Sequence, residues 1–170
     1  MISIEEIGNL KKPIIWTMHD SWPFCGSEHH PNGIKDKRYI EGYYSYTRDI
    51  FHRGLDLDKF NWNRKIKSWK KEMILVAPST WLASCAKKSK LMSNKKIKVI
   101  PNPLQTELYK PRSKIISRRK FDLPLDKTLI LYGSLASFDD EMKGWHLFKE
   151  TIRNISKKSL NISIVIFGCK

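Results

Sequence analysis

Twice along this chain, a short apolar run is followed by a segment with helical spacing and then by a second apolar run. The first such unit spans residues 73–100 and the second spans residues 129–167. Strand, helix and strand within about 30 residues are typical of a parallel βαβ unit. The sequence therefore predicts an α/β fold built on parallel sheets, and excludes purely helical and purely antiparallel architectures.

The remaining elements follow from the same periodicities. We expect strands at 13–18, 73–77, 97–100, 129–132 and 162–167, and helices at 60–72, 79–90 and 143–155. The strand at 13–18 is apolar throughout, so we expect it to be buried. Residues 21–58 contain Pro, Gly and many aromatic side chains without a clear period, which predicts a long irregular segment.

Residues 101–127 hold four prolines, several basic residues and little apolar periodicity. Such a composition is typical of a linker between domains. We therefore expect a first domain at 1–103, a linker and entry segment at 104–127, and a second domain at 128–170.

The chain of 170 residues carries a net charge of +15, and the charge is local. Between Lys59 and Phe121 there are 18 Lys and Arg and two acidic residues, so this region carries +16 and the rest carries −1. It could bind nucleic acid by stacking on Trp62, Trp69 and Trp81, or attract anionic lipid headgroups. It could equally be a solvated face whose tryptophans point into the core. A module that binds nucleic acid or lipid through this region would bind in a salt-sensitive way, with a slope that falls when Lys65, Lys67, Lys70 and Lys71 are neutralised.

The three cysteines are widely spaced and include no C-x-x-C pair, which argues against a disulfide framework and a structural zinc site. No run approaches the roughly 18 apolar residues that cross a bilayer. We expect a cytoplasmic protein, with peripheral association at the inner face of an anionic membrane through the basic region 59–121.

Two strand ends carry candidate functional side chains, because open α/β sheets bind ligands at the carboxyl ends of their strands. The first strand ends at His19, which could hydrogen-bond a substrate hydroxyl or act as an acid or base. It could equally brace a loop beside the turn-forming Asp20.

The second candidate follows the strand at 129–132. Gly133 and Ser134 come directly after this strand, and Lys143 and Gly144 precede the next helix. A helix N-terminus favours anions, and a lysine there indicates an anionic ligand such as a phosphate. The pattern matches no known phosphate-loop motif, so an ordinary βα loop is the alternative.

A third group, comprising Cys25, Glu28, His29 and His30, contains metal-ligating residue types. It holds only one thiol and matches no zinc spacing. We expect solvated loop residues rather than a metal site, and no metal cofactor.

Several ordered stretches resemble glycosyltransferase family 4, in particular enzymes of bacterial polysaccharide synthesis. They are PIIWTMHDSW at 13–22, RYIEGY at 38–43, NWNRKIKSWKK at 61–71, VAPSTWLASCAKKSKLM at 76–92, VIPNPLQTELYKP at 99–111, and GSL followed by KGWHLF within 133–148. The resemblance covers nearly the whole chain.

The resemblance implies a GT-B fold, in which two Rossmann-like domains bind an acceptor and a nucleotide-sugar. Residues 1–103 would be the C-terminal part of the acceptor domain, and 128–170 the first βαβ unit of the donor domain. The implied reaction is metal-independent transfer of a hexosyl group, with retention of configuration, to a glycan or lipid-linked acceptor. Basic side chains would stabilise the leaving diphosphate.

Residue by residue, the resemblance makes His19 the catalytic histidine near the sugar, with Asp20 and Trp22 in the acceptor-side loop. Gly133, Ser134, Lys143 and Gly144 would bind the donor. Family members usually carry a second basic residue beside this lysine. Ser134 and Met142 stand at those positions, so one expected cation is missing.

The family has strands before the equivalent of Ile14 and an acidic E-x7-E stretch after the equivalent of Phe167. We therefore expect a central fragment that is inactive or weakly active alone, and that a complementing chain could complete. The alternatives are a non-catalytic basic module that binds nucleic acid or anionic lipid, and a degenerate remnant without present function.

Overall fold

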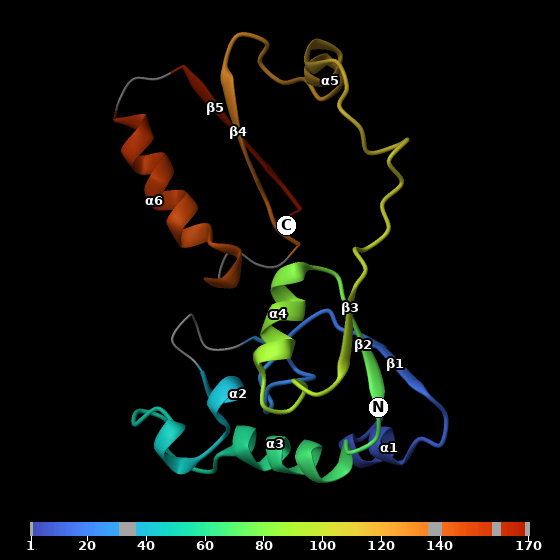
Figure 1. Cartoon of the computed structure of the whole chain (residues 1–170). Coiled ribbons are helices and arrows are strands. Elements are labelled where there is room, and N and C mark those ends of the chain that lie inside the picture. The colour runs from blue at the N-terminus through green and yellow to red at the C-terminus, as the bar shows by residue number, and fades with distance from the viewer. Residues whose placement is uncertain (1, 31–36, 136–140, 158–160, 169–170) are drawn as a thin grey trace. The chain divides into compact units, whose positions relative to one another are not determined.

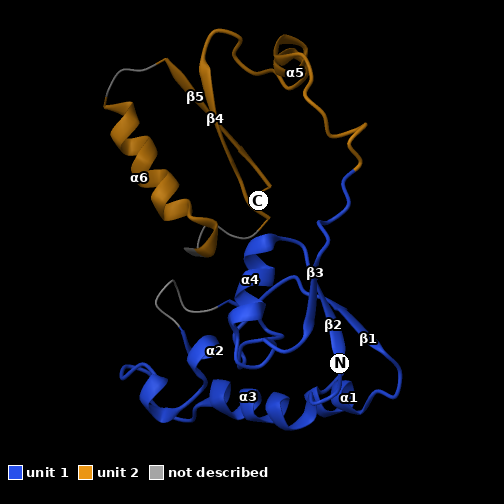
Figure 2. Ribbon diagram, viewed as in Figure 1, with its two compact units in different colours: residues 1–104 blue, residues 105–170 orange. Residues whose placement is uncertain are grey.

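A computed structural model describes residues 2–30, 37–135, 141–157 and 161–168 (Figure 1). The chain divides into two compact units, Met1–Leu104 and Gln105–Lys170 (Figure 2).

The first unit is built on a parallel sheet of β1 (Ile14–Thr17), β2 (Met73–Ala77) and β3 (Lys96–Val99) in the order β1-β2-β3. The central strand β2 is largely buried because it pairs on both edges and is apolar throughout. Strand β1 was expected to be buried as well, and this is wrong. It lies at one end of the three-stranded order and alternates half-buried and exposed positions, with Ile15 70% exposed.

The helices of this unit are α1 (Ile4–Asn9), α2 (Arg38–Glu41), α3 (Leu57–Ser68) and α4 (Thr80–Lys88), with a 3-10 turn η1 (Ser45–Thr47). The predicted N-cap of α4 is confirmed, since the Ser79 hydroxyl accepts a hydrogen bond from the Leu82 amide at 3.2 Å. The helix expected at 60–72 begins earlier, at Leu57, because Asp56 caps its first turn. It also ends earlier, at Ser68. Helix α1, which has a Ser3–Glu6 capping box, was not predicted.

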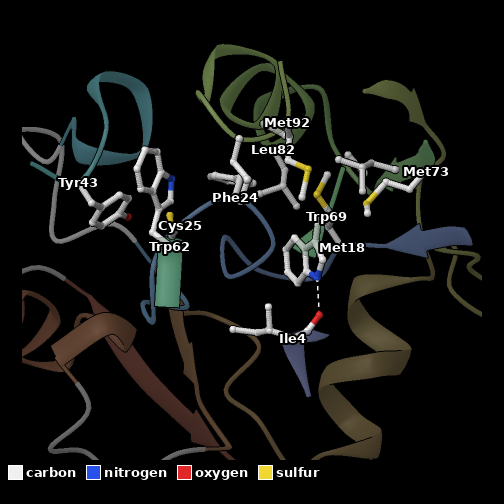
Figure 3. Packing of buried hydrophobic residues seen from close by; sticks show 14 residues of the cluster. Ile4, Met18, Phe24, Cys25, Tyr43, Trp62, Trp69, Met73, Leu82 and Met92 are labelled. Carbon is white, nitrogen blue, oxygen red and sulfur yellow. Dashed lines mark hydrogen bonds between the residues drawn. The ribbon is translucent and has the colours of Figure 1, made fainter. Parts of the chain in front are cut away.

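The core of the first unit gathers apolar side chains from the sheet, the helices and the loop after β1 (Figure 3). Trp62 and Trp69 are 4% and 3% exposed, and the indole N–H of Trp69 donates to the Ile4 carbonyl at 2.8 Å. Two of the three tryptophans in the basic region therefore face the core. Trp81 on α4 is 64% exposed.

The second unit contains α5 (Lys114–Lys120), β4 (Thr128–Gly133), a 3-10 turn η2 (Glu141–Lys143), α6 (Trp145–Ser156) and β5 (Ile162–Phe167). Strands β4 and β5 pair in parallel, with Gly133 opposite Phe167. The predicted βαβ unit is confirmed. Tyr132 packs against Trp145 and Phe148 of α6, with ring centroids 5.1 and 4.8 Å apart.

Helix α5 lies where only a linker was expected. Ser113 caps it, and the Arg118 guanidinium donates hydrogen bonds to the segment that follows the helix. Its acceptors are the carbonyls of Pro124, Leu125 and Lys127, at 2.8 to 3.0 Å. The protein is thus a mixed α/β chain with small parallel sheets. None of the helices in its described parts is long and apolar enough to cross a membrane.

Candidate functional site

The carboxyl end of β1 brings the acceptor-side candidates into one loop. The Met18 amide donates to the Val76 carbonyl at 2.8 Å, which extends the β-ladder by one residue and buries the Met18 side chain. His19 follows and is exposed. The imidazole is therefore accessible at the strand end, where parallel sheets bind ligands.

Asp20 holds this loop closed. One carboxylate oxygen accepts from the Trp22 amide at 2.9 Å, and the other lies 2.7 Å from Nδ1 of His29. The Ser21 amide donates to the His29 carbonyl at 2.8 Å. The histidine that braces the loop through Asp20 is therefore His29, while His19 stands outside these contacts.

Trp22 lies inside an aromatic cluster. Its ring is 5.9 Å from Trp16 and 5.7 Å from Trp69, measured between centroids, and the side chain is only half-exposed. These packed contacts stabilise the loop that carries His19 and Asp20.

Lys65 of α3 lies beneath the same loop and was missed as a structural residue by sequence reasoning. Its side chain is fully buried, and its Nζ donates to the carbonyls of Trp22, Cys25 and Gly26. Burial lowers the pKa of Lys65 to about 7, against the opposing effect of nearby Cys25 and Glu28. The expectation that Lys65 contributes to a basic binding surface is wrong, because its amine is turned inward.

The group Cys25, Glu28, His29 and His30 does not converge. Cys25 is buried, Glu28 accepts from the Tyr43 hydroxyl at 3.0 Å, and both histidines are exposed. Burial, with the charges of Cys25 and Glu28, raises the pKa of Tyr43 far above its usual range. Among the described residues, no three His, Cys, Asp or Glu side chains form a group that could hold a metal ion.

In the second unit, Gly133 ends β4 opposite Phe167 of β5. A Cβ atom at this position would lie 2.2 Å from the Phe167 ring. The missing side chain thus makes room for a neighbouring ring. The sequence suggested a different reason, the close approach of a ligand to the backbone.

Ser134 is buried, and its amide donates to the Phe167 carbonyl at 3.2 Å. Gly168, the residue after β5, has a φ of +81°, and a Cβ atom at this position would lie 2.7 Å from the Ser134 carbonyl oxygen. The two strand ends are therefore closely packed around Ser134.

Lys143 and Gly144 lie at the start of α6. Gly144 is the N-cap residue with φ of +69°, a conformation that suits glycine, and its carbonyl accepts from the Phe148 amide at 2.9 Å. Glycine has no side chain that could cap the first-turn amides. Lys143 is exposed, and its carbonyl accepts from the Tyr132 hydroxyl at 3.3 Å. A helix start with glycine at its N-cap and a cation one residue before it favours an anion.

The structure thus places His19, Asp20 and Trp22 on one loop of the first unit. In the second unit, Gly133 and Ser134 lie at the end of β4 and Lys143 and Gly144 at the start of α6, and Tyr132 of β4 contacts the Lys143 carbonyl. The loop 136–140 between Gly133 and Lys143 lies outside the described residues. The chain matches no protein-family model, no curated protein and no solved structure.

Proposed function

We propose that this chain is part of a retaining glycosyltransferase of family 4 with a GT-B arrangement of two Rossmann-like domains. It would transfer a sugar from a nucleotide-sugar to a glycan or lipid-linked acceptor in polysaccharide synthesis. The observation that carries the proposal is the β4–α6–β5 unit. In it, Gly133 ends one strand, and Lys143 and Gly144 lead into the helix of a parallel crossover.

The chemistry of the donor side fits this geometry. Cleavage of the bond between sugar and diphosphate leaves negative charge on the phosphate oxygens. The Lys143 ammonium and the first-turn amides of α6 would stabilise that charge more strongly in the transition state than in the ground state. Only one lysine side chain stands at this helix start, since Ser134 and Met142 occupy the positions where family members carry a second cation.

On the acceptor side, His19 is the exposed side chain at the end of β1. Asp20, Trp22 and the buried Lys65 fix the loop on which it stands. A fixed loop places the imidazole reproducibly, which is what orientation of an acceptor hydroxyl requires. We assign the catalytic role to His19 within this proposal, and the loop-holding role to Asp20 and Trp22.

Binding of inorganic diphosphate, UDP and GDP tests the donor side without requiring turnover. We expect chemical-shift changes in the ¹⁵N NMR spectrum at the amides of Gly144, Trp145 and His146. Lys143→Gln should weaken binding about tenfold, while Lys149→Gln, an exposed lysine one turn along the same helix, should leave it unchanged. Equal losses in both variants, or shifts away from the start of α6, would contradict the proposal.

A transfer assay with labelled nucleotide-sugars tests the reaction. We expect weak or no turnover by residues 1–170 alone, because the family resemblance assigns further donor contacts to an E-x7-E stretch and these residues contain no such spacing. Addition of a chain that supplies it should raise the rate. Fast turnover by the chain alone would contradict the need for a complementing chain.

The alternative class, a non-catalytic basic module, has the net charge of +15 in its favour. Stacking on nucleic-acid bases receives less support, because Trp62 and Trp69 are buried.

A further inference from the structure

Residues 46–60, here called the apolar segment, expose large hydrophobic side chains at an unusual density. Six of the fifteen residues are large hydrophobic groups that are 59% to 88% exposed, namely Tyr46, Ile50, Phe51, Leu55, Leu57 and Phe60. Single exposed apolar residues are ordinary, but concentrations of them mark interaction sites. The segment runs from η1 to the first turn of α3 (Figure 1), so it presents one continuous stretch of chain to a partner.

Polar contacts hold this segment in shape. The Asp49 carboxylate accepts a hydrogen bond from the Phe51 amide at 2.9 Å. The Asp56 carboxylate accepts from Arg38 of α2 at 2.7 Å and from the Lys59 amide at 3.0 Å. A loop that is already fixed loses little conformational entropy when a partner binds to it.

The segment also forms a groove with the start of α3. The groove has a volume of about 450 Å³ and is lined by Leu55, Asp56, Leu57, Lys59, Phe60 and Asn63. Phe51 is 83% exposed and lies outside this lining. The segment thus combines an open groove with an exposed aromatic ring, and aromatic side chains that fill pockets dominate the affinity of many protein interfaces.

The charge of the segment is balanced. It contains three basic and three acidic residues, namely Arg48, Asp49, Arg53, Asp56, Asp58 and Lys59. These charges cancel, so the whole net charge of +15 lies in the remaining residues. Of the six, Asp49 and Arg53 are the exposed ones. The exposed Lys67, Lys70 and Lys71 lie in the last turn of α3 and after it, at the other end of that helix.

We propose that the apolar segment is the contact surface of a two-fold dimer between two copies of this chain. A two-fold axis brings the same patch of both copies together. In a chain with a net charge of +15, most patches would meet a like charge in this way, and like charges oppose association. This segment meets its copy without net charge, and Asp49 of one copy would attract Arg53 of the other. Phe51 of each copy would enter the groove of its partner.

The exposed apolar area is sufficient for such an interface. A stable interface buries roughly 800 Å² per partner, and an aromatic side chain contributes about 150–250 Å². Tyr46, Phe51 and Phe60 with their three aliphatic neighbours therefore approach this area before any polar rim is counted. Because each copy contributes the same patch, no other partner is needed to cover it.

Two other occupants fit less well. An anionic bilayer and a nucleic acid both attract a protein through an excess of cations at the contact, and this segment has no such excess. A contact made by apolar groups with balanced charge instead suits a surface of the same composition.

Sedimentation velocity over a concentration series tests the proposal on the chain as it is. We expect a reversible equilibrium between monomer and dimer. It should shift toward the dimer when NaCl is raised from about 0.05 to 0.5 M, because salt screens the repulsion between two chains of +15. The double variant Phe51→Ser with Leu55→Ser should weaken dimerisation at least about tenfold. Trp81→Ser, which removes an exposed apolar side chain on α4, should dimerise like the parent.

Concentration-dependent changes in the ¹⁵N NMR spectrum locate the contact, and we expect them at the amides of residues 46–60. Far-UV circular dichroism and thermal melting establish that each variant is folded, and Leu55→Gln alone provides a milder change at the same place. A parent chain that stays monomeric would overturn the proposal, as would dimerisation that the double variant leaves intact or that Trp81→Ser weakens equally.

Binding of anionic vesicles or RNA that the double variant abolishes, with no dimer of the parent, would also overturn the proposal and would assign the segment to another occupant. The diphosphate experiment follows the start of α6 in the other unit, so this inference and the proposed function can fail separately.

Discussion

The ammonium nitrogen of Lys65 lies 3.8 Å from the centroid of the Trp22 ring, so a cation from α3 sits directly beneath the loop that follows β1. The same nitrogen donates to the carbonyls of Trp22, Cys25 and Gly26. An ammonium has three N–H donors, and here all three have acceptors. Contact with the Trp22 ring adds a cation–π attraction. One side chain from a distant helix thus fixes the loop that carries the acceptor-side candidates.

Replacement of this cation should destabilise the first unit. In Lys65→Met, three carbonyl groups lose their donor, while the cost of burying an ammonium disappears. Because each unsatisfied buried acceptor costs about 1–3 kcal/mol, we expect a net loss of roughly 1–3 kcal/mol in the free energy of unfolding. Urea denaturation measures it, with the exposed Lys67→Met as the matched control. A loss in Lys67→Met as large as in Lys65→Met would contradict this role.

The pKa of Lys65 also predicts how stability depends on pH. Burial lowers this pKa to about 7 in the folded chain, while an unfolded lysine keeps its proton to about pH 10. Between these values the unfolded state binds more protons, so the contribution of Lys65 to the free energy of unfolding rises with pH, by up to about 1.4 kcal/mol per pH unit.

Denaturation curves of the parent and of Lys65→Met between pH 6.5 and 10 provide the measurement. The difference between the two chains isolates this residue from the other groups that titrate in the same range. If the difference in the free energy of unfolding between the two chains stays constant or shrinks as pH rises, the pKa of the Lys65 amine is not lowered in the folded state.

The sequence predicts β1, β2, β4 and β5 well because each is a compact run of mainly apolar, strand-forming residues, while β3 alternates lysine with Ile97 and Val99. It places the candidates at strand ends for the same reason, since parallel strands end at loops. Helix α5 was missed because its basic and proline-rich surroundings hide a short helix, although Ser113 carries an N-cap signal.

The role of Lys65 depends on contacts 39 to 43 residues away along the chain, which periodicity cannot provide. One local signal was present. Trp62, Lys65 and Trp69 are three and four residues apart, so they share one face of α3, and a lysine between two buried tryptophans is expected to be buried too. Gly133 is a similar case, because only the register with Phe167 reveals which group fills the space.

Asp56 connects the start of α3 to α2 through a largely buried ion pair with Arg38. Burial raises the pKa of Asp56, but hydrogen bonds from Arg38 and from the Lys59 amide outweigh this effect and lower the pKa overall. Its stabilisation is therefore present above about pH 4, the unfolded value, and is lost as pH falls through the lowered folded value.

Asp56→Asn keeps a good N-cap residue and removes only the charge. We expect a loss of about 1–3 kcal/mol in the free energy of unfolding at pH 7, and this loss should disappear in acid. Acid titration of unfolding by circular dichroism measures it, and the exposed Glu72→Gln serves as control. An unchanged acid transition in Asp56→Asn would show that the pair with Arg38 contributes nothing.

The contact between Gly133 and Phe167 yields a prediction that separates packing from ligand binding. In Gly133→Ala, the new methyl group would meet the Phe167 ring at 2.2 Å, so the ring or the strand must move. Such overpacking costs about 1–3 kcal/mol. Hydrogen exchange of the amides of β4 and β5 measures the local stability without interference from the first unit.

Phe167→Leu removes the ring that the new methyl group would meet. The double variant should therefore recover most of the stability that Gly133→Ala loses. The rescued double variant allows a second measurement, its affinity for inorganic diphosphate. If glycine at 133 serves packing alone, the double variant should bind diphosphate like the parent. Restored exchange protection with lost diphosphate binding would instead show that the backbone of Gly133 contacts the ligand, and that both demands fall on the same residue.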